Sequence, residues 1–146
     1  MGAAGSLMED NVAAWNAHDE AAWSGTFAQD ATLSGPGGVR GTGSEMVSTF
    51  YHLWQDAFPD NQVRIVRIVD GGDSVVQEAV FEGTHTEALN APGGSIPATG
   101  KRVSIPFALV TEVSEGRFTS FALYFDQMEL LTQLGLAEAL SAAETT

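Results

Sequence analysis

The sequence predicts an α+β domain in which three N-terminal helices pack across one face of a strongly curved antiparallel sheet. Two observations support this prediction. Apolar residues recur at helical spacing over most of residues 6–58, and from residue 62 onward they recur at every second position. Two turn sequences, GGD at 71–73 and EG at 115–116, connect pairs of predicted strands. The length of 146 residues fits one domain, residues 1–146, with 1–6 and 137–146 as flexible tails.

The N-terminal segment is predicted to form two short helices that break near His18. Asp19 stands where a helix N-cap is expected, and its carboxylate can accept a backbone N–H of the second helix. The apolar stripe of the two helices consists of Leu7, Val12, Trp15, Ala22, Trp23 and Phe27.

A short strand at 31–35 and a glycine-rich loop at 35–44 follow. Ser44 is expected to cap a third helix, residues 45–58, which Pro59 ends. The loop contains neither G-K-[ST] nor a full G-x-G-x-x-G, so a phosphate-binding role is not expected.

Four long strands are predicted in two hairpins, at residues 62–70 with 74–86 and at 101–114 with 117–126. Residues 87–100 between the hairpins are too long for a tight turn and are expected to be either a lid or a flexible loop. A last helix is predicted from residue 127 to a stop at Gly135.

Composition excludes several classes of partner. The formal net charge of −13, from 19 acidic and 6 basic side chains, repels nucleic acid and anionic membranes, so neither is an expected partner. The absence of cysteine excludes disulfides and a thiolate nucleophile. Three histidines on three separate elements argue against a metal site.

The first ten residues lack signal-peptide features, and a soluble cytoplasmic protein is expected.

The predicted strands carry large apolar residues on both faces, most clearly at 118–125. One face must pack on the helices, and the other needs a cavity or a second subunit, because a large exposed apolar face promotes association. We therefore expect a homodimer formed through the sheet.

Three segments resemble the SnoaL-like polyketide cyclases, also described as ester cyclases, of the nuclear transport factor 2 (NTF2)-like superfamily. They are G-T-H at 83–85, P-x-T-G-K-R from Pro97, and Y-F-D followed by Q-L-G near the C-terminus, within a match from about Leu7 to Leu136. The resemblance implies an NTF2-like cone enclosing a cavity. It also implies aldol-type ring closure of a small, hydrophobic, aromatic polyketide-like substrate in secondary metabolism, such as antibiotic biosynthesis, without metal or cofactor.

Asp126 is the principal candidate catalytic residue. In this family an aspartate on the last strand projects into the cone as the acid/base, and Asp126 occupies that motif position. Strand alternation places it on one face with Phe118 and Tyr124, where apolar walls would raise the pKa of its carboxyl group toward neutrality. Alternatively, Asp126 only caps the helix that follows.

His85 is the second catalytic candidate, since the G-T-H turn could place it at the cavity mouth, although a histidine beside a loop is also a common structural hydrogen bonder. The candidate substrate-binding residues are Trp15, Phe27, Phe50, Trp54, Phe81, Phe107 and Tyr124, of which about half are expected to be ordinary core. Three functions stay open: a polyketide cyclase or isomerase, a related enzyme such as a dehydratase or hydroxylation component, and a non-catalytic small-molecule carrier.

Overall fold

The computed structural model describes residues 2–137. Its elements are α1 (Ala3–Asn16), α2 (Glu20–Ser24), β1 (Phe27–Gly35), β2 (Val39–Thr42), α3 (Ser44–Ala57), β3 (Gln62–Asp70), β4 (Ser74–Thr84), β5 (Leu89–Ala91), β6 (Gly94–Ile96), β7 (Arg102–Ser114), β8 (Arg117–Phe125) and α4 (Gln127–Gln133). The predicted α+β class with a curved sheet is confirmed. No helix within these residues is long and apolar enough to cross a membrane.

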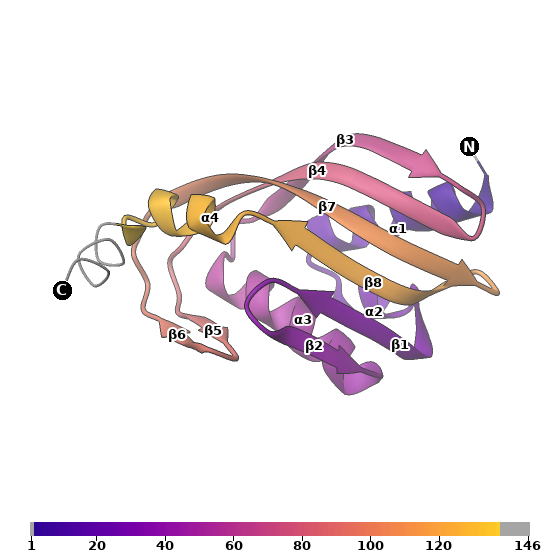
Figure 1. The fold of residues 1–146 in the computed structure, drawn as a ribbon, viewed down its shortest axis with the longest axis horizontal. Helices are drawn as coiled ribbons and strands as arrows, with labels where there is room; N and C mark the ends of the chain where they lie inside the picture. Colours follow the sequence, from indigo (N-terminus) through magenta and orange to yellow (C-terminus); the bar gives the residue numbers. More distant parts are fainter. Residues whose placement is uncertain (1, 138–146) are drawn as a thin grey trace.

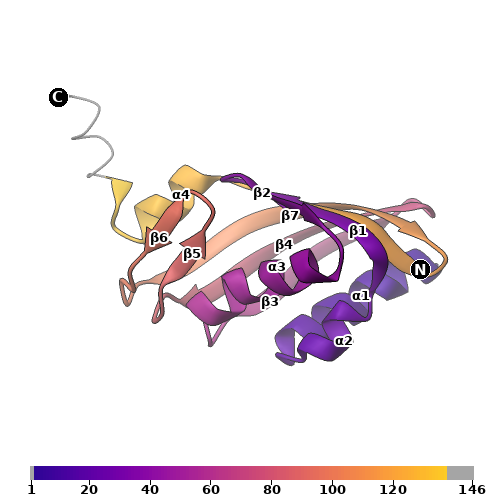
Figure 2. The same cartoon turned by 90° about the horizontal axis from the view of Figure 1, so that it is seen from below.

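Six strands form one sheet in the order β2-β1-β8-β7-β4-β3. All neighbours are antiparallel except β1 and β8, which run parallel. Helices α1, α2 and α3 lie together on one side of the curved sheet, and α4 follows β8 at one end of it (Figures 1 and 2).

The break between the first two helices lies where the sequence predicts it. His18 has a φ of 55°, which interrupts the helical path. The Asp19 carboxylate accepts the backbone N–H of Ala22, which satisfies one of the free donors at the start of α2.

Two expected boundaries differ in the structure. Residues 3–6, which were expected in a flexible tail, form the first turn of α1, and β1 begins at Phe27 rather than at residue 31. Of the tail expected at 137–146, residues 138–146 lie outside the described residues.

Three further details differ from the sequence-based expectations. The glycine-rich segment contains β2, which pairs with β1 from Thr32↔Thr42 to Gly35↔Val39. The N-cap of α3 is Gly43 rather than Ser44, because the chain enters the helix with a φ of 92°, which glycine adopts at little cost. Residues 87–100, expected to be a lid or a flexible loop, contain β5 and β6, which pair as a separate hairpin beside α3.

A register shift between β7 and β8 determines which side chains of β8 face the helices. Glu112 pairs with Ser120 and Val113 with Phe118, so one extra residue of β8 lies between these pairs. Phe118 and Phe121 are both buried as a result, while Tyr124 is 59% exposed. The prediction that Phe118 and Tyr124 share one face is therefore wrong, because the bulge breaks strand alternation.

Candidate functional site: an aromatic pocket between helices and sheet

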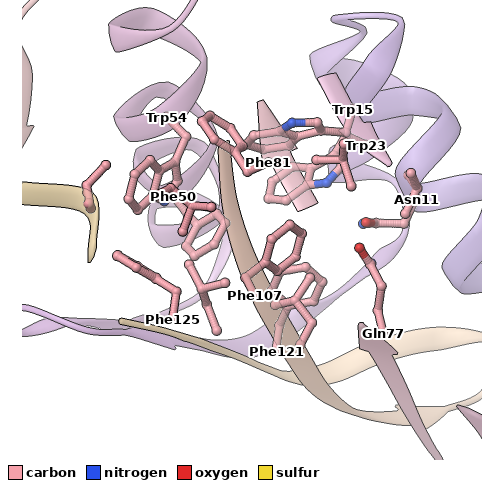
Figure 3. A pocket seen from close by; sticks show the side chains of 16 residues that line it. Asn11, Trp15, Trp23, Phe50, Trp54, Gln77, Phe81, Phe107, Phe121 and Phe125 are labelled. Carbon is pink, nitrogen blue, oxygen red and sulfur yellow. The ribbon is translucent and has the colours of Figure 1, made fainter. Parts of the chain in front are cut away.

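A pocket lies between the helices and the inner face of the sheet (Figure 3). Its volume is ≈ 70 Å³. All but two of its lining side chains are apolar or aromatic, and none is ionisable. The lining residues are Asn11, Val12, Trp15, Trp23, Phe50, Trp54, Val63, Gln77, Phe81, Ile105, Phe107, Leu109, Phe121, Leu123, Phe125 and Leu130.

Strand alternation and helix periodicity bring these side chains together. On β4 every second residue from Val75 to Gly83 is buried, which directs Gln77 and Phe81 inward. From the opposite side, α3 presents Phe50 and Trp54, four residues apart on one helix face. Side chains from β7 and β8 form the floor (Figure 3).

Trp23 is the centre of the aromatic wall and is 1% exposed. Its ring centroid lies 4.6 Å from that of Phe27 and 6.0 Å from those of Phe50 and Phe121. Trp15 packs against it at 5.3 Å. The Trp23 ring stacks on Phe50, with 12° between the ring planes, and its contacts with the other three rings are tilted or edge-to-face. Such contacts are favourable at these distances, so the rings of this wall stabilise one another.

A buried hydrogen-bond network holds Trp15 in the wall. Trp15 Nε1 donates to Asn61 Oδ1 at 2.7 Å. Asn61 Nδ2 donates to Gln55 Oε1 and to the carbonyl oxygen of Phe58, both at 2.8 Å. Gln55 Nε2 closes the ring by donating to the Trp15 carbonyl oxygen at 3.0 Å. Every member is buried, so the network orients the indole without leaving polar atoms unpaired.

The amide groups of the two polar lining residues, Asn11 and Gln77, point toward one another (Figure 3). Asn11 Nδ2 donates to Thr26 Oγ1 at 3.0 Å. Gln77 Nε2 donates to Met8 Sδ at 3.1 Å, whereas Gln77 Oε1 is buried without a hydrogen-bond partner among the described residues. An unpaired buried acceptor costs about 1–3 kcal/mol.

A second unpaired polar atom belongs to Trp54. Its indole Nε1 is buried and has no hydrogen-bond partner among the described residues. The Trp54 ring packs edge-on against Phe81 at 5.8 Å and Phe125 at 5.4 Å. The pocket wall therefore contains one unpaired acceptor and one unpaired donor.

Asp126 does not project into the pocket. Its side chain is exposed, and its Oδ1 accepts the backbone N–H groups of Met128 at 2.9 Å and Glu129 at 3.2 Å as the N-cap of α4. The expectation of apolar walls around this carboxylate is wrong, because Asp126 continues the outward face of Tyr124 rather than the inward face of Phe125. Its neighbour Phe125 lines the pocket, so Asp126 lies one residue beyond the pocket wall.

His85 is 0% exposed and lies outside the pocket lining, so the expectation of a position at the cavity mouth is wrong. The backbone N–H of Thr99 donates to its Nδ1 at 3.2 Å, and its ring lies 5.2 Å from Phe58. Burial lowers the pKa of His85 below its usual value, since the apolar surroundings disfavour the imidazolium. These contacts fit the alternative of a structural hydrogen bonder.

Five of the seven predicted substrate-binding residues line the pocket: Trp15, Phe50, Trp54, Phe81 and Phe107. Phe27 does not, because it is buried behind Trp23 and packs against Phe118 and Phe121. Tyr124 does not either, because it lies on the outer face of the sheet.

Sequence reasoning did not single out the amides of Asn11 and Gln77 as pocket residues. For Gln77 a signal was present, since it stands at an inward strand position between Val75 and Ala79, both buried. A polar residue at such a position needs a partner in the core or in a ligand. No comparable pattern marks Asn11, which follows Asp10 in a polar stretch of α1.

Comparison with known proteins gives one family and one fold. The model of the SnoaL-like polyketide cyclase family matches residues 6–134. No curated protein matches the chain. IdmH from Streptomyces antibioticus, a proposed polyketide cyclase, is 25% identical with a TM-score of 0.72, over 89% of this chain and 96% of that chain.

Two further solved structures share the architecture. One is a protein of ketosteroid isomerase-like fold from Catenulispora acidiphila in complex with trimethylamine, 25% identical with a TM-score of 0.73, over 89% of this chain and 92% of that chain. The other is AclR from Streptomyces galilaeus, a proposed hydroxylase, 23% identical with a TM-score of 0.74, over 89% and 93% of the two chains. The expected NTF2-like fold is thereby confirmed.

Proposed function

Because the chain belongs to the SnoaL-like polyketide cyclase family, we propose that it binds an aromatic polyketide-type compound in the pocket and promotes an aldol-type ring closure within it. The observation that carries this proposal is the composition of the pocket wall, which is aromatic and apolar except for two amides. Such a wall binds planar, weakly polar rings and excludes water. A volume of ≈ 70 Å³ is too small for a polycyclic substrate, so binding requires the pocket to widen, and we expect half-buried lining rings such as Phe107 and Phe125 to move.

The main contribution of the pocket to ring closure is proximity. An aldol step removes a proton beside one carbonyl, and the resulting enolate carbon then attacks a second carbonyl of the same molecule. The new alkoxide takes up a proton, so the reaction involves no net change of oxidation state and needs no oxidant or reductant. A pocket that folds the substrate holds the two carbons together, and such pre-orientation can contribute about 7–11 kcal/mol to lowering a barrier.

Asp126 is our candidate for the group that takes and returns the proton, acting at the pocket rim. Phe125 before it and Leu130 after it both line the pocket, which supports a rim position for the carboxylate. The aromatic body of the substrate would lie inside while the reacting side chain extends to α4. His85 has no part in this step, because it lies outside the pocket lining.

We expect Asp126→Asn to lower the cyclisation rate by about 10²- to 10⁴-fold, the usual contribution of a positioned acid/base. Asparagine caps helices as well as aspartate does, so the stability of α4 should be retained. The measurement is conversion of an open-ring anthraquinone ester to its ring-closed isomer, followed by liquid chromatography with mass-spectrometric detection, with thermal unfolding in parallel. Glu129→Gln, an exposed carboxylate of the same helix, is the matched control and should cyclise at the wild-type rate.

An Asp126→Asn protein that cyclises as fast as the wild type would leave Asp126 with the capping role alone. Binding without turnover in both proteins would favour the second candidate function, a non-catalytic small-molecule carrier. That candidate is supported by the absence of ionisable side chains from the pocket lining and by the capping contacts of Asp126. Turnover to another product would indicate a related isomerase, dehydratase or hydroxylation component, and AclR has been proposed to be a hydroxylase.

We also propose that a second copy of the chain covers the outer face of the sheet. Register aligns Val69, Val76, Val110 and Ala122 in one apolar row across four strands. Val69 and Val110 are 53% and 43% exposed. The same face carries the pairs Arg67–Glu78 and Arg64–Glu82, so two copies related by a two-fold axis could exchange these opposite charges.

Light scattering after size exclusion should give the mass of two chains for the wild type and of one chain for Val110→Glu, which puts a charge in the centre of the apolar row. Val110 points away from the pocket, so ligand binding should not change. A wild-type protein with the mass of one chain would contradict the dimer.

A further inference from the structure

We propose that Gln77 determines substrate specificity by accepting a hydrogen bond from a phenolic or enolic hydroxyl group at its end of the pocket. This inference rests on the proposed function, since it assumes an aromatic ligand in that pocket. It goes further by stating which polar group the ligand carries and where that group binds.

The first observation is the unpaired oxygen of Gln77. The residue is 1% exposed, so water at the protein surface does not solvate its side chain. Its amide points into the pocket toward Asn11 (Figure 3), and Oε1 has no hydrogen-bond partner among the described residues. A buried acceptor that lines a pocket and lacks a partner can gain one from a ligand.

The second observation fixes which atom of the amide faces the ligand. Gln77 Nε2 donates to Met8 Sδ at 3.1 Å. A thioether sulfur can only accept, so it holds the nitrogen on the α1 side and leaves the oxygen toward the cavity. The ligand group must therefore be a donor. A ketone oxygen at this position would face the Gln77 oxygen and be repelled.

The neighbouring polar side chain, Asn11, has a hydrogen bond of its own. Asn11 Nδ2 donates to Thr26 Oγ1, whose hydroxyl donates to the Trp23 carbonyl oxygen at 2.6 Å. This contact uses one N–H of the Asn11 amide, and Gln77 Oε1 receives no hydrogen bond from the other. The acceptor itself is thus available to a ligand, because Gln77 keeps its hydrogen bond to Met8 when a hydroxyl arrives.

Trp54 gives the ligand a direction. Its unpaired Nε1 is a donor and suits a carbonyl oxygen. Trp54 packs on Phe81, which lies four residues from Gln77 along β4. At the usual rise per strand residue, the Cα atoms of Phe81 and Gln77 are about 13 Å apart. A ligand that satisfies both atoms has a hydroxyl at the Gln77 end and a carbonyl at the Trp54 end. The carbonyl then lies toward α4, where the proposed ring closure takes place.

The test compares two ligands of nearly equal size, 2-naphthol and 2-methylnaphthalene, by calorimetric titration of the wild type and Gln77→Met. The wild type should bind 2-naphthol about tenfold more tightly, as expected for one hydrogen bond to a buried acceptor. Gln77→Met keeps the length and removes the oxygen, so the preference should fall to about one. The unliganded variant should melt at the wild-type temperature or a few degrees higher, since it loses an unpaired polar atom.

Each outcome decides a different claim. Equal affinities of the wild type for the two ligands would overturn the role of Gln77 and leave the aromatic pocket as the binding site. Failure of both ligands to bind would overturn the proposed function together with this inference. A preference that persists in Gln77→Met would show that another group binds the hydroxyl. If Gln77→Met does not fold, Gln77→Leu replaces it, and the two ligands on the wild type still test the preference.

Discussion

Replacing Asn61 by leucine is expected to lower the free energy of unfolding by about 3–5 kcal/mol, although the two side chains have similar size. The change leaves Trp15 Nε1 and Gln55 Oε1 without their partners at 2.7 and 2.8 Å in the buried network. Each unpaired group then has its own desolvation cost of about 1–3 kcal/mol. Because Trp15 lines the pocket, its indole should also lose its fixed orientation.

Urea denaturation followed by circular dichroism measures this effect as a lower midpoint with an unchanged slope. Asn90→Leu is the matched control. Asn90 is exposed on the β5–β6 hairpin, and its Oδ1 accepts the Ser95 hydroxyl at 2.8 Å at the surface, so the expected change is within about 0.5 kcal/mol. An Asn61→Leu protein as stable as the control would contradict a structural role for the network.

Replacing Trp23 by alanine should be similarly costly, at about 3–5 kcal/mol, the usual range for truncating a buried aromatic residue. The indole is 1% exposed and packs against rings from four other elements, including Phe27 at 4.6 Å and Tyr51 at 5.5 Å. Its loss leaves a void that the surrounding rings can fill only in part. That void opens onto the pocket, which should become larger.

The variants Trp23→Ala and Trp54→Ala form a matched pair for thermal and urea unfolding. Both residues line the pocket, but Trp54 is only half-buried, near Phe125. Trp54→Ala should cost only about 1.5–3 kcal/mol, because less apolar surface is removed from the core. Equal destabilisation by the two substitutions would show that the wall around Trp23 is no better packed than the wall at Trp54.

Most of the architecture could be predicted because local signals and tertiary structure agree. The change from helical to alternating periodicity near residue 60 separates the helices from the long strands, and the turns GGD and EG set both hairpins. Strand β2 was not predicted. It contains only four residues in a glycine-rich segment, and its pairing with β1 depends on a tertiary contact that local propensity does not encode.

The error at Asp126 has a specific physical origin. Large apolar residues at Phe118 and Tyr124 suggested one inward face that continued to Asp126. The bulge of β8 adds one residue between the two, so Phe118 faces the core and Tyr124 faces outward. A bulge leaves no mark in hydrophobic alternation until the partner strand is known. The capping role, by contrast, was among the predicted alternatives, because aspartate before a helix is a strong N-cap signal.

The central claim is that the aromatic pocket binds the substrate, and tryptophan fluorescence tests it most directly. All three tryptophans of the chain, Trp15, Trp23 and Trp54, line the pocket, so no tryptophan elsewhere contributes background emission. Titration with an open-ring anthraquinone ester should quench the emission until one ligand is bound per chain. Quenching that rises linearly without saturation, as it does for free N-acetyltryptophanamide, would contradict the claim.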